Sequence, residues 1–416
     1  MIKRLKKGDS SREMATGQGK GRTRRENQNQ DWIDKQKQPK ETGAAMSNFR
    51  LFAVAPPGLE SIVKSELQDL GISGRKVAGG VEFSGGLFHL CQANLWLRTA
   101  SRVLLRLGSF RLTSLEQAAE RFSRYPWEIY LRPSRPIRFR ITCHKSKIFH
   151  SGALEERLIK GIQVRLGKKI KVARMSDARS DDPLIVLRLF RDNCTLSIDS
   201  SGRHLHYRGL KTMNVTAPLR ENLAAAMLLA SGWDRTSPLL DPFCGSGTIL
   251  IEAALMGMNI PPGRFRKFAF QNWRNFDAAM WHRVVAAADL ERRPLTAQIK
   301  GFDRSVQAIE AAEANLAACG LFPDVTVEQR ELSMLDSPAS KGWLVTNSPY
   351  GKRLKEIHGL GGLYSEFGEI IRERFPAWTV AMLSPHPFLQ RATKLAFRSV
   401  ATFSNGGIRV NLLLHK

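Results

Sequence analysis

The stretch LLDPFCGSGTILIEAAL contains the residue types in this chain best suited to holding a small ligand. Its pattern predicts a strand that ends at Asp241 and a helix that begins near Ser246, with Gly245 and Gly247 in the turn between them. Glycine lets the backbone approach a ligand closely, and the first N–H groups of a helix can bind it. A Walker nucleotide loop is excluded because no Lys precedes Thr248. A cofactor-binding turn and a plain strand-to-helix connection both remain open.

Two further strand ends carry polar residues. The strand QIKGFD ends at Asp303, where a carboxylate can accept both hydroxyls of a ribose. The strand WLVTN ends at Asn347 and continues into Ser348, Pro349 and Tyr350, which form either a simple turn or one wall of a substrate site. In an open α/β sheet, ligands bind at the carboxyl ends of the strands. We therefore expect these strand ends to form one site at a single sheet edge.

Residues 205–416 alternate strands and helices at the spacing of a parallel α/β sheet. A helix over 217–233 precedes the first strand. The apolar runs on either side of Asn405-Gly406-Gly407 predict a hairpin, so the parallel sheet should end in an antiparallel pair. The predicted parallel strands are 239–241, 298–303, 325–331, 343–347 and 378–383.

Residues 48–204 predict a smaller α+β region in front of this domain. Short strands and helices alternate along it, which suits two compact ferredoxin-like modules at 48–110 and 111–204. Residues 1–47 are basic, rich in Gln, Asn and Gly, and almost devoid of apolar side chains. Such a segment cannot bury a core, so it is expected to be a disordered tail.

The composition favours a nucleic-acid partner. The chain has 416 residues, with 64 Lys and Arg against 38 Asp and Glu and a formal charge of +26. A hydrophobic fraction of 43% supports two or three globular domains and excludes a collagenous or wholly disordered protein. From Met46 onward 52 basic side chains face 32 acidic ones, which leaves +20 in the folded body. This excess favours a polyanion over a merely basic, solvated surface.

Cysteine spacing and hydropathy exclude other classes. Five Cys occur and none forms a CxxC pair, which argues for reduced thiols in a cytoplasmic protein and against a metal site. No apolar stretch approaches the roughly 18 residues of a spanning helix, so no membrane partner is expected. We therefore expect a soluble, cytoplasmic protein without a metal.

Long stretches of the chain resemble one known family, the THUMP-domain guanine-N2 RNA methyltransferases. The resemblance rests on LFAVAPPGLE, VAGGVEFSG, LSIDSSGRHLHYRGLK, TAPLRENLAAAMLLASGW, DPFCGSGTILIEAALMGMNIPPG and NSPYGKRL, and it covers nearly everything after Met46. It is closest to the bacterial type with a single catalytic domain that acts on 23S ribosomal RNA. The implied fold class is α/β, a Rossmann-like class I methyltransferase domain preceded by α+β ferredoxin-like and THUMP modules.

The resemblance implies a reaction and leaves rival substrates. A methyl group would pass from S-adenosylmethionine to the exocyclic N2 of a guanine in RNA, with 23S rRNA or a pre-ribosomal particle as partner. A transfer RNA guanine is the nearest rival substrate. The chain could also be an RNA-binding protein with a decayed methyltransferase domain. A DNA adenine-N6 enzyme shares the Asn-x-Pro-Tyr motif, yet it would not need a THUMP-like module.

Site roles follow from the resemblance, one residue at a time. Asp303 matches the ribose ligand, and Glu331 matches the acidic position that receives the adenine amino group, with Asp336 as a competitor. The turn that holds the methionine part of the cofactor is matched by Asp241, Gly245 and Gly247.

The target-base motif of the family is matched by Asn347, Pro349 and Tyr350, while Ser348 stands where the family normally has a first proline. The exocyclic nitrogen of guanine shares its lone pair with the ring and is a poor nucleophile, so acceptors must localise that pair. The Asn347 side-chain oxygen and the Ser348 carbonyl would accept the amino protons, and Tyr350 would stack on the base.

The stretch between Gly257 and Gln298, rich in Trp and Arg, matches the family's insertion and explains why Asp303 lies far beyond Asp241 in the sequence. Most Trp and Phe residues of the chain are expected in the core. An RNA-facing loop and a core position remain open for the aromatic residues interleaved with Arg264, Arg266 and Lys267, which are Phe265, Phe268 and Phe270.

Overall fold

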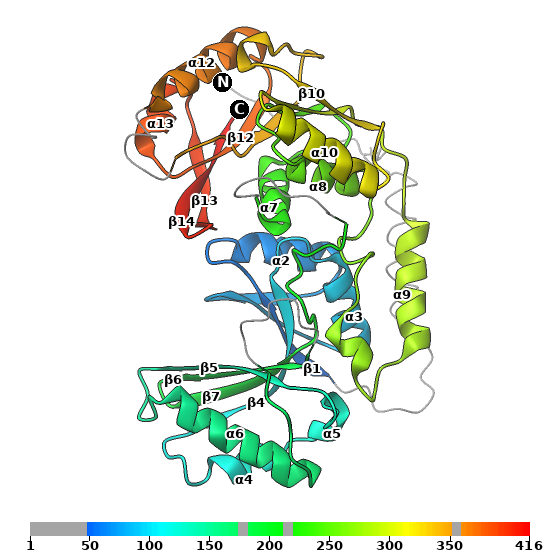
Figure 1. Ribbon diagram of the computed structural model, residues 1–416, viewed down its shortest axis with the longest axis vertical. Helices are drawn as coiled ribbons and strands as arrows, with labels where there is room; N and C mark the ends of the chain where they lie inside the picture. The colour runs from blue at the N-terminus through cyan, green and yellow to red at the C-terminus, as the bar shows by residue number, and fades with distance from the viewer. Residues whose placement is uncertain (1–47, 174–181, 211–218, 352–358) are drawn as a thin grey trace, which may run out of the picture. The chain divides into compact units, whose positions relative to one another are not determined.

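Two seven-stranded sheets organise the residues that this computed structural model describes, which are 48–173, 182–210, 219–351 and 359–416 (Figure 1). Both sheets belong to one compact unit that extends from Ser47 to Lys416. The tail predicted over 1–47 lies outside the described residues.

The first sheet has the strand order β2-β3-β1-β4-β7-β6-β5, and only its β5–β6 pair is parallel. Strand β4 pairs with β1 on one side and β7 on the other, so the two predicted modules share one continuous sheet. The strands are β1 (Phe49–Val54), β2 (Gly74–Val77), β3 (Gly80–Gly85), β4 (Arg102–Arg111), β5 (Arg138–His144), β6 (Leu184–Phe190) and β7 (Asn193–Asp199). The helices are α2 (Glu60–Asp69), α3 (Leu87–Trp96), α4 (Ala118–Ser123), α5 (Trp127–Tyr130) and α6 (Ser151–Leu166).

Buried and more exposed side chains alternate along these strands, so one face of the sheet packs against helices and the other face does not. In β6, Ile185, Leu187 and Leu189 are fully buried, whereas Val186 and Arg188 between them are not. Successive side chains of a strand point to opposite faces, so the apolar set meets the helices. Figure 1 shows α4, α5 and α6 on one side of β5, β6 and β7.

The second sheet has the order β10-β9-β8-β11-β12-β14-β13 and confirms the predicted parallel α/β arrangement. Its first five strands are parallel, and β14 pairs antiparallel with both β12 and β13, as the Gly406-Gly407 turn predicted. The strands are β8 (Leu239–Asp241), β9 (Ile299–Asp303), β10 (Val325–Gln329), β11 (Trp343–Thr346), β12 (Thr379–Ser384), β13 (Arg398–Asn405) and β14 (Ile408–His415). The helices are α7 (Glu221–Ser231), α8 (Thr248–Gly257), α10 (Val306–Ala318), α12 (Gly361–Arg374) and α13 (Pro387–Ala392).

The insertion between α8 and β9 folds into a 3-10 turn, η1 (Ala269–Asn272), and one helix, α9 (Ala278–Leu290). Phe268 and Phe270 are each only 2% exposed, lie 5.4 Å apart, and both contact the Trp281 ring edge-on. The RNA-facing alternative is therefore wrong for these two residues, because their rings complete the core of the first sheet. Phe265 alone of the three remains exposed.

Buried polar contacts connect the helices of the first sheet to those of the second. The Arg98 guanidinium, just after α3, donates to the Ile260 carbonyl (2.6 Å), and Arg208 donates to Glu252 of α8 (2.8 Å). Glu66 of α2 accepts the backbone N–H of Arg98 (2.6 Å). Removing one member would leave a buried charge without its partner, which is costly. This network fixes the first sheet against the parallel domain.

No helix among the described residues is long and apolar enough to cross a membrane. No three His, Cys, Asp or Glu side chains in those residues gather closely enough to hold a metal ion. The five cysteines are free thiols, and Cys91, Cys194 and Cys244 are buried.

Candidate active site

The predicted strand ends meet at one edge of the second sheet. Strand β8 lies between β9 and β11, and all three run in the same direction. Asp241 ends β8 and Asp303 ends β9, while Thr346 ends β11 and is followed by Asn347. Neighbouring parallel strands bring their carboxyl ends together, so the structure places Asp241, Asp303 and Asn347 at one edge as the sequence predicted, with Thr346 beside them.

The glycine turn between β8 and α8 requires glycine at two places. Gly245 (φ 53°) and Gly247 (φ 77°) have left-handed backbones, which cost L-residues with a side chain about 1–2 kcal/mol. Gly247 is also the residue before the first turn of α8, and a Cβ there would lie 3.4 Å from Ala312 of α10. The turn therefore brings the backbone and the N-terminus of α8 to the ligand edge of the sheet.

Asp303 is held by two backbone donors. Its Oδ2 accepts the Gly245 N–H (3.1 Å) and its Oδ1 accepts the Ser305 N–H (3.0 Å), while the residue stays half-buried. An ionised carboxylate offers about four acceptor positions. Each oxygen therefore keeps capacity for one further donor, which is what two vicinal hydroxyls need.

Asp241 is almost completely buried, with 1% exposure. Its Oδ1 accepts the Thr346 hydroxyl (2.6 Å) and the Phe243 N–H (3.2 Å). Burial raises the pKa of Asp241 to about 7, and the nearby charge of Asp303 pushes in the same direction. The Thr346 contact was missed by sequence reasoning, because Thr346 there counted only as a strand residue.

Asn347 carries the most informative atom of the edge. Its Oδ1 is buried and accepts no hydrogen bond from any of the described residues, although the residue as a whole is half-buried. Leaving such an acceptor unsatisfied costs about 1–3 kcal/mol. A donor supplied by a ligand would recover that cost, so the geometry fits a substrate that presents an N–H or O–H group.

The loop at Ser348 is held by a hydrogen bond to helix α12, whereas the family that the chain resembles has a proline at this position. Its buried hydroxyl lies 2.8 Å from the Tyr364 hydroxyl, which itself donates to the Pro349 carbonyl (3.1 Å). Two consecutive loop residues are thus tied to one side chain. Hydrogen bonding restrains the loop at the position where the resembling family uses a proline.

We expect a coupling free energy of about 1 kcal/mol between Ser348 and Tyr364, because one buried neutral hydrogen bond contributes about that much. A double-mutant cycle of Ser348→Ala and Tyr364→Phe, followed by urea unfolding, measures it. Strictly additive losses in the double variant would show that the two hydroxyls do not stabilise each other.

The Tyr350 side chain is held in place by packing and by a hydrogen bond. Its ring is half-buried against the apolar cores on both sides of the sheet, and its hydroxyl accepts a hydrogen bond from Asn405 Nδ2 (2.8 Å). The sequence assigned Asn405 to the β13–β14 hairpin only. No local signal links two residues 55 positions apart, so only the folded sheet identifies Asn405 as a positioning residue.

Glu331 lies two residues beyond the end of β10, the strand next to β9, and its side chain is exposed. It precedes the short 3-10 turn η2 (Leu332–Met334). Its competitor Asp336 instead contacts Arg374 at 3.4 Å. The position at the sheet edge therefore favours Glu331 over Asp336 as a ligand for a group bound beside Asp303.

Family models match both halves of the chain. Residues 208–412 match the RMKL-like methyltransferase domain, and residues 50–104 match the RlmL ferredoxin-like domain. The first match contains the whole strand-end site, and the second contains β1 to β3 and the start of β4.

Similar proteins extend across nearly all described residues. The chain is 32% identical to "Putative RNA methyltransferase slr0064" of Synechocystis sp. over 88% of its own length and 96% of that protein. It is 34% identical to the ribosomal RNA large subunit methyltransferase K/L of Syntrophotalea carbinolica, of which it spans only 53%. The chain is also similar to the crystal structure of SMU.472 complexed with SAH, with 30% sequence identity and a TM-score of 0.79. This match covers 88% of the present chain and 98% of the SMU.472 chain. With this extent of similarity, the chain belongs to the RMKL-like family of S-adenosylmethionine-dependent RNA methyltransferases.

Proposed function

We propose that this chain methylates the exocyclic N2 of a guanine in large-subunit ribosomal RNA. The observation that carries the proposal is the buried Oδ1 of Asn347, to which no described residue donates a hydrogen bond, at the same sheet edge as Asp241 and Asp303. The K/L relatives are named for the large ribosomal RNA, although the chain spans about half of their length. The chemistry of the edge and these names support the same substrate class.

The residues of the edge fit the proposed cofactor. S-adenosylmethionine, when bound, supplies an electrophilic methyl group on a cationic sulfonium. The oriented carboxylate of Asp303 would accept the ribose hydroxyls, and Glu331 would accept the adenine amino group. The glycine turn would hold the methionine part, and Asp241 at the end of β8, when ionised, would add negative charge for the cation.

Asn347 would act on the nucleophile. Guanine N2 is weakly nucleophilic because its lone pair is delocalised into the ring. If Asn347 Oδ1 and the backbone carbonyl of Ser348 accept its two protons, the lone pair becomes localised and points toward the methyl group. Positioning and electrostatics of this kind can supply the rate without a strong general base.

The target base has to leave its helix to reach this edge. Enzymes that modify bases pay a few kcal/mol to unstack the nucleotide and recover the cost by stacking it in a pocket. The half-buried Tyr350 ring, held by Asn405, offers one stacking surface with a fixed orientation. We assign residues 205–416 to catalysis, and 48–110 and 111–204 to ferredoxin-like and THUMP modules that bind RNA.

We expect Asp303→Ala to weaken S-adenosylmethionine binding by about 1–3 kcal/mol, because the charge-assisted bonds to the ribose are lost. Isothermal titration calorimetry of the full chain measures this directly. Glu310→Ala, on the exposed side of α10, is the matched control and should bind as wild type does. Equal affinity in all three proteins would remove Asp303 from the cofactor site.

Nucleoside analysis tests the reaction itself. The protein is incubated with labelled S-adenosylmethionine and large-subunit RNA lacking the modification, offered naked and as immature particles, and the RNA is then digested. N2-methylguanosine is the expected product. Product formed only on transfer RNA would change the substrate, and N6-methyladenine in DNA would replace the proposed reaction.

A further inference from the structure

We propose that the helix-free face of the first sheet is a binding platform for single-stranded RNA, a surface built from alternate residues of its strands. This inference rests on the proposed function, since it supplies that enzyme with a place to hold its substrate away from the reacting base. The accessible face is defined by exposed or half-buried residues that point away from the helices: Arg75, Glu82, Ser84, Arg50, Arg106, Thr195, Val186, Arg188, Phe190, Arg140, Thr142 and His144. Phe52, Leu104 and Ser197 lie on the same side of the strands but are buried.

The strand register brings these residues onto one side. Arg50 of β1 is paired with Arg106 of β4, and Arg106 is paired with Ser197 of β7, whose hydroxyl it also contacts (3.0 Å). Arg188 of β6 pairs with Thr142 of β5. The intervening residues of the same strands belong to the buried core, so the polar set must face the other way.

Charge on this face is strongly one-sided. The seven strands contain two acidic residues, Glu82 and Asp199, and each is ion-paired with an Arg of its neighbouring strand region. Among the described residues, Arg50, Arg140 and Arg188 of the face are exposed and form no ion pair, whereas Arg75 is paired with Glu82. Arg50 and Arg106 stand directly opposite each other in the register of β1 and β4. Burial lowers the pKa of Arg106 to about 10, the negative charge of Glu82 opposes this effect, and the positive charges of Arg188 and Arg50 add to it. Clustered cations with few counter-charges fit a polyanion.

Aromatic rings lie among these cations. The Arg106 guanidinium lies 4.2 Å from the centre of the Phe52 ring. Phe190 has the guanidinium groups of Arg188 and Arg191 at 5.1 and 5.4 Å, and the exposed His144 ring lies parallel to it at 5.9 Å. Rings that alternate with cations bind single strands well, because any base has a face that can stack.

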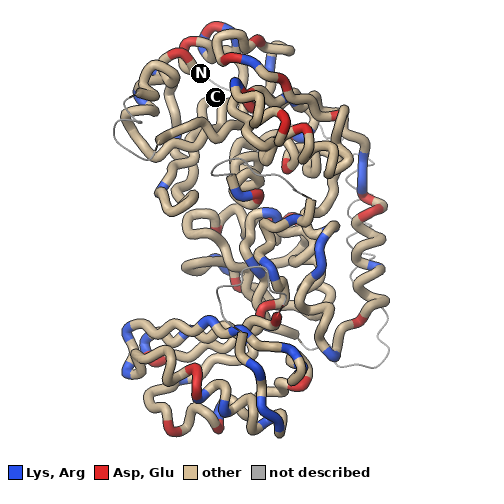
Figure 2. Tube along the Cα trace, in the orientation of Figure 1, with Lys and Arg blue, Asp and Glu red and all other residues tan. Residues whose placement is uncertain are grey.

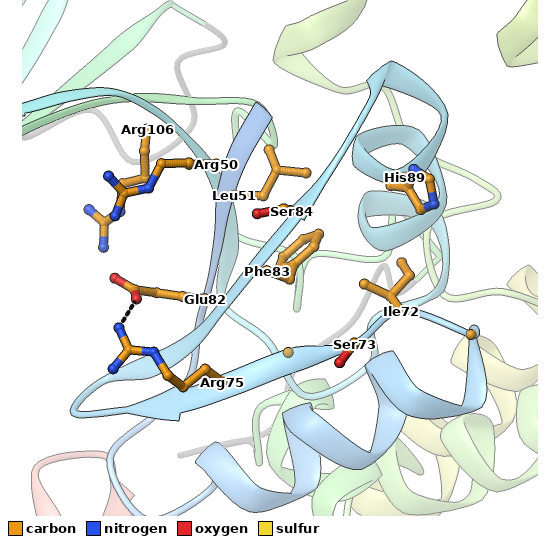
Figure 3. A pocket seen from close by; sticks show the side chains of 12 residues that line it. Arg50, Leu51, Ile72, Ser73, Arg75, Glu82, Phe83, Ser84, His89 and Arg106 are labelled. Atoms are coloured by element: carbon orange, nitrogen blue, oxygen red, sulfur yellow. Dashed lines mark hydrogen bonds and ion pairs between the residues drawn. The ribbon is translucent and has the colours of Figure 1, made fainter. Parts of the chain in front are cut away.

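A hollow of about 530 Å³ lies at the β2 and β3 edge of the sheet. Arg50, Arg106, Glu82 and Arg75 line it from the face, and Ile72, Phe83 and His89 line it from the helix side. Figure 3 shows Arg50 and Arg106 extending to the same side, near Glu82, which is paired with Arg75 (2.6 Å). Figure 2 shows Lys and Arg recurring along the strands of this sheet. The face is therefore basic, and its Arg side chains reach the hollow at the sheet edge.

The occupant is single-stranded for a geometric reason. In a duplex the base faces are stacked on one another, so aromatic side chains on a sheet can reach only phosphates and sugars. Unpaired bases can lie flat on such rings while their phosphates meet the Arg side chains. The Phe190, His144 and Arg188 group offers both kinds of contact in one place.

The test measures binding of a labelled single-stranded oligoribonucleotide of mixed sequence, and of the same RNA as a duplex, by fluorescence anisotropy with the full chain. Arg50→Glu with Arg188→Glu should weaken single-strand binding about tenfold or more and flatten its salt dependence. Arg157→Glu with Lys160→Glu, exposed residues of α6 on the helix side, makes the same charge change and is the control. It should bind within about twofold of wild type, as expected for charges outside the footprint.

Phe190→Ala separates stacking from charge. It should weaken single-strand binding about 5- to 100-fold with an unchanged salt slope, and duplex binding much less. Thermal unfolding confirms that each variant is folded. Equal losses of RNA affinity in the face and α6 variants would overturn the platform. If the duplex binds more tightly than the single strand and Phe190→Ala does not change affinity, the occupant is not single-stranded RNA.

These outcomes are separate from those of the methylation assay, because binding is measured without S-adenosylmethionine. A protein that binds RNA on this face yet methylates nothing would lose only the proposed reaction. If the protein methylates ribosomal RNA, and the face variants bind and react as the α6 control does, the proposed reaction stands and only the platform is wrong.

Discussion

Replacing Asn347 with alanine is expected to lower the single-turnover rate of methyl transfer by about 10²- to 10³-fold, which is typical for removing one preorganised group that acts in the transition state. Cofactor affinity should not change, because the proposed role of Asn347 is toward the target base, while the proposed ribose ligand is Asp303. Single-turnover assays with saturating S-adenosylmethionine and calorimetry of the same variant measure the two quantities.

The same substitution carries its own structural control. Asn347 Oδ1 accepts no bond from the described residues, and its unsatisfied burial costs about 1–3 kcal/mol, so Asn347→Ala should leave the free energy of unfolding unchanged or raise it. Asn405→Ala, which removes only the bond to the Tyr350 hydroxyl, should slow transfer much less. A fully active Asn347→Ala, or one that is inactive because it unfolds, would contradict the assigned role.

Replacing Asp241 with asparagine is expected to stabilise the protein above pH 7 and to weaken the cofactor. The pKa of Asp241 is raised from 3.8 to about 7, chiefly by burial. A raised carboxyl pKa means that stability is full below about pH 4 and is lost as the pH rises toward 7. At 1.36 kcal/mol per pKa unit the loss reaches about 4 kcal/mol, and asparagine, which resembles the protonated form, should not suffer it.

Urea unfolding of wild type and Asp241→Asn between pH 4 and pH 8 tests the sign. The two proteins should converge at the acidic end and differ most at the alkaline end, with Asn more stable. Asp289→Asn is a control of opposite sign, because hydrogen bonding to Arg264 lowers the pKa of Asp289 and that stability is present at high pH. Parallel curves for wild type and Asp241→Asn would contradict the raised pKa.

Cofactor binding supplies the second half of this prediction. An ionised Asp241 beside Asp303 attracts the cationic sulfonium, so wild-type affinity for S-adenosylmethionine should rise with pH up to about 7. Asp241→Asn should bind more weakly and lose this pH dependence. Calorimetry at pH 6 and pH 8 on both proteins, with Thr346→Val to remove the hydrogen bond alone, separates charge from geometry.

The insertion shows where local pattern was insufficient. Phe265, Phe268 and Phe270 alternate with cations in the sequence, which is compatible with both an RNA-facing loop and a buried strip. The choice depends on whether another surface covers the rings, and Trp281 and the core of the first sheet cover two of them. Whether such rings are buried depends on a residue far away in the sequence, and the local sequence does not show which residue that is.

The sequence by itself determined the strand ends, the glycine turn and the closing hairpin, because each depends on neighbours within a few residues. Asp241, Gly245, Gly247 and Asp303 needed only the rule that parallel strands end at one edge. Glu331 and Pro349 came from the family resemblance, and their roles remain proposals.

Only the tertiary structure decided how these parts work together. The bond of Asn405 to Tyr350 and that of Tyr364 to Ser348 each join residues from different elements. That no described residue donates to the buried Asn347 Oδ1 is likewise visible only in the folded protein. The joining of both N-terminal modules through β4 likewise depends on pairing between distant strands. Long-range contacts of this kind carry no local periodicity, so sequence could predict where the site lies but not which atoms are left free to act.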